Sequence, residues 1–122
     1  MNSKLTPLQI EILRDRLSLD DCLLEVMRDT YYEDGKAMPS DAELELAFGQ
    51  VNALLVTKNL ETAGNMSEHA RWILEDCYDG STWTDRADNA FQDGEISQQK
   101  LAAERRAFEN LGEKLRAAGL EV

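Results

Sequence analysis

Residues 40–56 read SDAELELAFGQVNALLV, and this stretch decides the fold class. Ser40 and Glu43 have the spacing of a capping box, in which the two side chains accept hydrogen bonds from free N–H groups at the start of a helix. Apolar side chains then recur every three or four residues, at Leu44, Ala47, Phe48, Val51, Leu54 and Leu55. This is the period of one helix face, so the stretch predicts a long helix to about Val56 with one side buried.

The segment before this helix contains two further helix starts. Thr6 and Gln9 form a second capping box, with a proline at the first helical position, and predict a helix over about residues 7–17. Ser18 starts another amphipathic helix, which Gly35 is placed to end.

The segment after residue 56 predicts three more helices. The first runs over about residues 67–78, a short one follows over about 85–91, and Ser97 caps the last, which Gly119 ends. Residues 59–65 are the expected mid-chain connection, and no segment alternates like a strand. The sequence therefore predicts an all-α fold, a compact bundle of about five or six helices in a single domain over all 122 residues.

A weak internal similarity raises the alternative of two related three-helix halves. Residues 12–15, ILRD, are echoed by residues 73–76, ILED, and residues 33–35 are echoed by residues 92–94. Unrelated amphipathic helices produce such matches too, so the duplication stays open.

The composition favours a folded cytoplasmic protein. Apolar residues make up 43% of the chain, yet no apolar run is long enough to span a bilayer, and the N-terminus lacks the apolar stretch of a secretory signal. Cys22 and Cys77 fall at apolar positions of predicted helices, which favours buried reduced thiols, with a Cys22–Cys77 disulfide as the alternative.

The residue clusters that accompany catalysis or metal binding are missing from the sequence. His69 is the only histidine and has no second ligand at a chelating spacing. Asp34-Gly35 and Asp93-Gly94 resemble the centre of a calcium loop, but Thr30 and Asn89 occupy the first ligand positions. No glycine-rich phosphate loop or nucleophile motif is present. We therefore expect no enzyme activity, no catalytic residue, no metal and no cofactor.

The charge balance bears on the kind of partner. The chain has 24 acidic and 13 basic residues, a net charge of −11 that repels nucleic acid and anionic membranes. We expect no direct contact with either, and expect a basic protein surface as the partner.

The placement of the acidic residues indicates where that partner binds. One predicted helix stacks four like charges at every fourth position, although each such pair costs roughly a few tenths of a kcal/mol. A second acidic segment, residues 75–95, contains an aromatic anchor candidate. The predicted partner-binding residues are Asp21, Glu25, Asp29, Glu33, Asp34, Asp76, Asp79, Trp83, Asp85 and Asp88. The alternatives are an acidic face that serves solubility alone and, for Trp83, a ring that covers the core. The last helix alternates basic and acidic residues, which predicts pairing among its own charges.

These observations predict an acidic, non-enzymatic protein that occupies a basic, often nucleic-acid-binding, surface of another protein, in the manner of a nucleic-acid mimic. Phage-type inhibitors of a host nuclease or CRISPR complex and immunity proteins against nuclease toxins are similar in size and charge, although no motif identifies a family. The alternative is a structural or assembly component, such as a dimerisation module or a phage morphogenesis factor. Either a monomer or a dimer fits the sequence.

Overall fold

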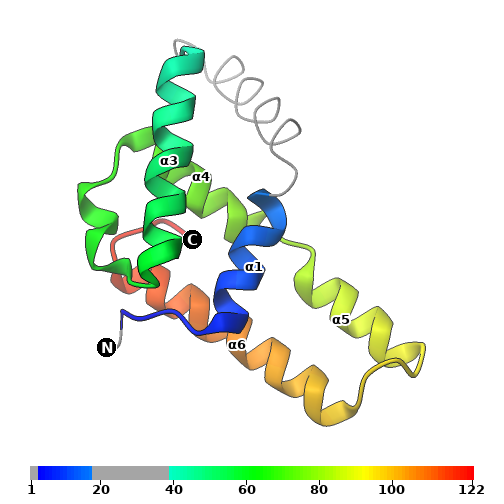
Figure 1. The fold of residues 1–122 in the computed structure, drawn as a ribbon. Coiled ribbons are helices and arrows are strands. Elements are labelled where there is room, and N and C mark those ends of the chain that lie inside the picture. Colours follow the sequence, from blue (N-terminus) through cyan, green and yellow to red (C-terminus); the bar gives the residue numbers. More distant parts are fainter. Residues whose placement is uncertain (1–2, 18–38) are drawn as a thin grey trace.

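The computed structural model describes residues 3–17 and 39–122, and within them it confirms the all-α class. Its elements, in chain order, are α1 (Pro7–Leu17), α3 (Asp41–Thr57), the 3-10 helix η1 (Leu60–Asn65), α4 (Glu68–Asp79), α5 (Trp83–Gln92) and α6 (Gln98–Ala117) (Figure 1). The β structure of the described residues is an isolated antiparallel bridge between Lys4 and Asn59. The predicted helix that begins at Ser18 lies outside the described residues, so the count of five or six helices stays a prediction.

The helix starts form as the local sequence predicts. The Glu43 N–H donates to Ser40 Oγ over 3.1 Å, and the Ser40 N–H donates to Glu43 Oε1 over 3.3 Å. The Thr6 and Gln9 pair makes the same reciprocal bonds over 3.2 and 3.1 Å. The predicted capping boxes are therefore confirmed. Ser67 and Ser97 likewise cap α4 and α6.

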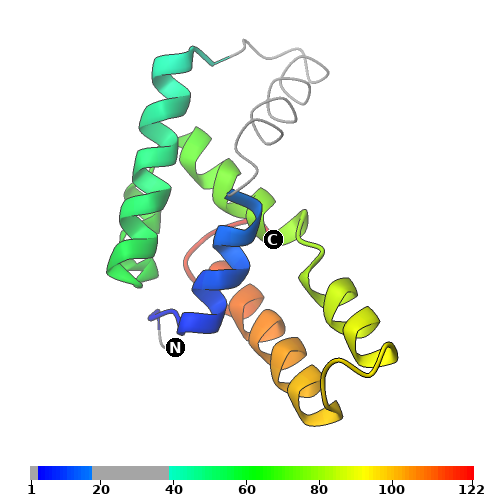
Figure 2. The same cartoon turned by 45° about the vertical axis from the view of Figure 1, so that its right-hand side comes forward.

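The hydrophobic core lies where four helices meet. Helix α4 packs against α1 and α3, and α1 also packs against α6 (Figures 1 and 2). Fully buried side chains come from each of these helices, among them Ile12, Leu13, Leu44, Leu54, Leu55, Ile73, Leu74, Leu111 and Leu115. Burial of large apolar side chains from segments far apart in the chain is the main stabilising contribution to such a fold.

A buried polar network ties α1 to α6. The Gln9 side chain is 1% exposed and donates to the Ala107 carbonyl over 3.2 Å and to Asn110 Oδ1 over 3.0 Å. Lys114, 7% exposed, donates from Nζ to Gln9 Oε1 over 2.9 Å and to the Lys4 carbonyl over 2.7 Å. Burial lowers the pKa of Lys114. The prediction that the charges of the last helix pair with one another is therefore wrong for Lys114.

Helix α5 and the first part of α6 form an arm, which we define as residues 83–105. Both views show α5 beside α6 and away from α3 (Figures 1 and 2). Ala87 and Leu101 are buried in the arm but lie outside the main core cluster. An ion pair between Arg105 and Asp88 joins the two helices of the arm.

Candidate protein-binding surface

The structure describes only the C-terminal part of the predicted partner-binding surface. The residues of the predicted N-terminal acidic stripe lie outside the described residues: Asp21, Glu25, Asp29, Glu33 and Asp34. Of the others, Asp76 and Asp79 lie at the end of α4, whereas Trp83, Asp85 and Asp88 lie on α5. The structure therefore places the second group around the α4–α5 junction.

Asp88 and Trp83 are held by other parts of the fold. Asp88 forms an ion pair with Arg105, so its charge is offset locally. The ring of Trp83 is partly buried against the core, and the Arg86 guanidinium lies 5.3 Å from the ring centroid. Trp83 Nε1 is buried without a hydrogen-bond partner in the described residues. Asp79 and Asp85 are exposed and are the better placed of the predicted residues to meet a partner.

Tyr78 joins the end of α4 to the middle of α6. Its ring stacks on Phe108 with the centroids 4.4 Å apart and the planes 12° apart. Its hydroxyl lies directly over Gly112, where an added Cβ would come within 2.3 Å of Tyr78 Oη. The absence of a side chain at Gly112 therefore allows the Tyr78 ring to pack closely against α6.

Carboxylates from both helices gather around this ring. Burial is the main cause that raises the pKa of Tyr78; Arg116 opposes it, and the charges of Asp79, Glu109 and Glu113 raise it further. The pKa of Asp79 is raised by burial and by the neighbouring Asp76. We name this cluster, Asp79, Glu109 and Glu113 around Tyr78 with Asp76 beside Asp79, the Tyr78 acidic face.

Two basic side chains of α6 are engaged away from this face, although the alternating sequence predicts pairing within the helix. Arg105 is paired with Asp88, and the Lys114 ammonium is held in the interior. Arg116 donates from Nη1 to the Val122 carbonyl over 3.4 Å. Within the described residues, Glu109 and Glu113 form no ion pair. Arg116 thus opposes the three carboxylates at Tyr78 without forming an ion pair with Glu109 or Glu113 in the described residues, and these carboxylates outnumber it.

Part of this face was open to prediction from the sequence. Glu109 and Glu113 are like charges four residues apart on one helix, the same pattern that marks the predicted acidic stripe. The contact of Tyr78 with Gly112 joins residues far apart in the chain, and no local pattern indicates it.

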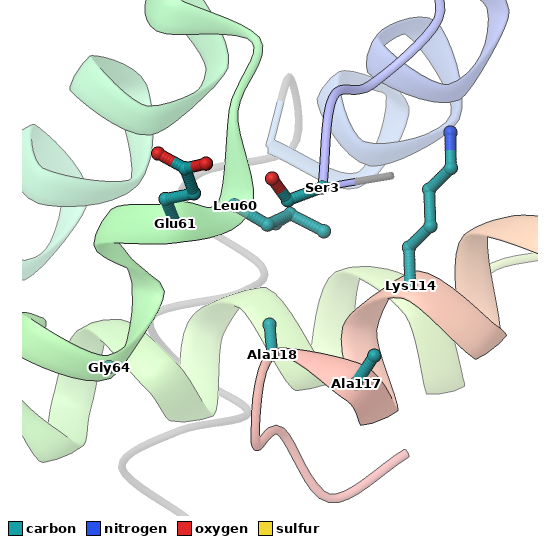
Figure 3. A pocket seen from close by; sticks show the side chains of 7 residues that line it. All are labelled: Ser3, Leu60, Glu61, Gly64, Lys114, Ala117 and Ala118. Atoms are coloured by element: carbon teal, nitrogen blue, oxygen red, sulfur yellow. The ribbon is translucent and has the colours of Figure 1, made fainter. Parts of the chain in front are cut away.

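A hollow of about 460 Å³ lies between η1 and the C-terminal end of α6 (Figure 3). Its lining residues are Ser3, Leu60, Glu61, Gly64, Lys114, Ala117 and Ala118. The Lys114 side chain extends toward the N-terminal segment, where its ammonium donates to the Lys4 carbonyl (Figure 3). The Ser3 hydroxyl donates to Asn59 Oδ1 over 3.0 Å. Both polar groups are thus engaged within the fold, and the lining offers no grouping of side chains suited to a reaction.

The side chains that commonly bind metals do not converge in the described part of the chain. No group of three or more His, Cys, Asp or Glu residues there could hold a metal ion. His69 Nε2 instead lies 3.4 Å from Glu43 Oε2. The pKa of Glu43 is lowered, first by the hydrogen bonds from Ser40 and then by His69. His69 therefore contributes to a contact between the start of α3 and α4.

None of the helices in the described ranges has both the length and the apolar character needed to cross a membrane. Comparison of the chain with protein-family models, with curated proteins and with solved structures gives no match.

Proposed function

We propose that this chain is an acidic, non-catalytic binding protein of the cytoplasm that occupies a basic surface of another protein. The observation that carries the proposal is the Tyr78 acidic face, where α4 and α6 bring the carboxylates of Asp79, Glu109 and Glu113 around one aromatic ring. The partner surface is one that otherwise binds nucleic acid, as in a phage-type inhibitor of a host nuclease or CRISPR complex.

Electrostatics and packing support this assignment. A surface with more carboxylates than basic groups steers a basic partner during diffusional encounter and repels other acidic surfaces. A rigid, partly buried aromatic ring among charges suits the centre of an interface, because it offers apolar area at a small cost in side-chain entropy. Tyr78 has both properties, since Phe108 and Gly112 hold its ring in place.

A charge-matched pair of variants tests the proposal. Glu109→Lys/Glu113→Lys reverses the face, whereas Glu11→Lys/Glu68→Lys makes the same change in net charge at exposed residues of α1 and α4. We expect the first variant to slow association with the partner by at least about tenfold at low salt and the control to have a much smaller effect. The partner is obtained by affinity capture from the native cell, and association is measured by surface plasmon resonance.

Competition identifies the surface of the partner that is occupied. A short DNA or RNA duplex should displace the wild-type chain from the captured protein if both bind the same basic surface. Rising ionic strength should weaken the complex steeply. Equal effects of the two double variants, or capture of a partner that nucleic acid does not displace, would contradict the proposal.

An assembly or dimerisation function is the second candidate. The observation that favours it is an exposed apolar face on α3, where Leu46 and Val56 are 63% and 70% exposed. Association through such a face should respond little to salt, because burial of apolar surface rather than charge stabilises it.

A further inference from the structure

Helix α3 is apolar on two opposite faces. Its inward face belongs to the core, and both views place the helix at the edge of the fold (Figures 1 and 2). Its outward face consists of Ala42, Leu46, Gly49, Ala53 and Val56, all exposed, which we name the α3 outer seam. Their spacing of four, three, four and three residues is that of the a and d positions of a coiled coil. A helix with apolar residues on opposite faces is typical of one that is covered on both.

The glycine at the middle of this seam has no role inside the fold described here. A Cβ added at Gly49 would meet no atom within 4 Å. Glycine has a low helix propensity, so any larger residue except proline would stabilise the helical conformation of α3. Glycine and alanine in the middle of a helix face do allow the backbone of a second helix to approach closely. Gly49 and Ala53 provide such a place.

We propose that the α3 outer seam is a self-association surface, on which two copies of this chain pair their α3 helices in antiparallel orientation. A two-fold axis between Gly49 and Ala53 sets Leu46 of each copy opposite Val56 of the other. The same axis sets Gly49 opposite Ala53. Small residues then meet at the crossing point and the large side chains pack on both sides of it, which makes the surface complementary to itself.

The charges of α3 favour the antiparallel orientation. The start of the helix is acidic, with Asp41, Glu43 and Glu45 all exposed. Parallel pairing sets the acidic starts of the two copies beside each other, whereas antiparallel pairing keeps them apart. The two helix dipoles also oppose one another in the antiparallel arrangement.

Sedimentation equilibrium of the full chain tests the pairing. A seam of two heptads is shorter than a standard interface, so we expect dimers with a dissociation constant on the order of 10 µM. Leu46→Glu should weaken dimerisation at least about tenfold, because it places a charge in the seam. Ala103→Glu, at an exposed position of α6, is the matched control and should not. A wild-type chain that is monomeric at about 500 µM would overturn the proposal; residues 18–38 or a different protein would then be the occupant of the seam.

Gly49→Leu separates a structural role from an interface role. The substitution should raise the melting temperature of the dilute monomer, since the position is open and leucine favours a helix. It should also weaken dimerisation, because the helices can no longer approach closely. A Gly49→Leu chain that has both a higher melting temperature and a tighter dimer than the wild type would overturn the proposal.

Cysteine cross-linking tests the orientation in a Cys22→Ser background. A mixture of Leu46→Cys and Val56→Cys chains should form mixed disulfide dimers, whereas each variant alone should not. Cross-linking of each variant with itself would indicate parallel pairing and contradict the proposal. Glu109→Lys/Glu113→Lys should leave dimerisation unchanged, so self-association and the acidic-face proposal can fail independently.

Discussion

The two ends of α6 lie in different surroundings. Near its C-terminus, Leu111 and Leu115 are buried in the core together with residues of α1, α3 and α4. Near its N-terminus, Leu101 is buried in the arm, where α5 supplies Ala87. A large buried side chain contributes about 1.5–3 kcal/mol, whereas an exposed ion pair such as that of Arg105 contributes about 0–1 kcal/mol. We therefore expect the arm to open locally at a lower free energy than the core.

The largest expected effect comes from emptying the core. Ile73→Ala should lower the free energy of unfolding by about 2–5 kcal/mol, because Ile73 is fully buried among side chains of several helices and leaves a cavity. Leu101→Ala in the arm should cost about 2 kcal/mol or less, because only two helices surround the site and they can move together to fill the cavity. Urea denaturation followed by circular dichroism measures both. Equal losses would mean that the arm and the core are one cooperative unit.

The contact that joins α4 to α6 gives the next effect. Gly112→Ala places a Cβ against the Tyr78 hydroxyl and should destabilise the protein by about 1–3 kcal/mol, because the ring has to move. Gly49→Ala is the control; it meets no atom within 4 Å and should stabilise the monomer by about 0.5–1 kcal/mol. Thermal unfolding of dilute protein measures the direction of both changes in stability. If Gly112→Ala left the stability unchanged, the Tyr78 ring would not need to pack this closely against Gly112.

The buried lysine provides a test with a pH dependence. Lys114→Met should cost about 1–3 kcal/mol at neutral pH, because the Lys4 carbonyl loses this donor and Gln9 Oε1 keeps only the Thr6 N–H. Burial lowers the pKa of Lys114 below its ordinary 10.5, so between the two values the unfolded chain binds more protons. The ionisation of Lys114 should therefore make the free energy of unfolding of the wild type rise with pH in that window. Lys114→Met should lack this rise. The measurement is urea denaturation at a series of alkaline pH values.

The sequence predicts those features that depend on neighbouring residues. Ser40 and Glu43 lie three residues apart, so their reciprocal hydrogen bonds and the start of α3 follow from local geometry. Helix α5 begins at Trp83, two residues before the expected start, and Thr82 makes no side-chain cap. The Trp83 N–H donates to Ser81 Oγ instead, and the ring packs against the core. Tertiary contacts therefore set this boundary.

The candidate site depended on contacts between distant segments. The charge of their own segment predicts Asp76 and Asp79, whereas Glu109 and Glu113 join them only because the Tyr78 ring at the end of α4 stacks on Phe108 of α6. Lys114 belongs to a charged, alternating helix by sequence but is buried by the approach of the N-terminal segment. A single sequence gives no signal for such pairings, because they depend on how the helices pack.

The smallest expected effect concerns the ion pair of the arm. Asp88→Asn removes the partner of Arg105 and should lower global stability by about 0–1 kcal/mol, because exposed pairs are screened by water. Its local effect should be clearer. Backbone amides of α5 should exchange faster with deuterium, while amides of α3 and α4 keep their protection, since opening of the arm does not require the core to unfold. Asp93→Asn removes an exposed acid just after α5 and should leave exchange unchanged. Faster exchange throughout the chain would instead mean that the arm and the core open together, whereas a change confined to α5 would place the division between them at this pair.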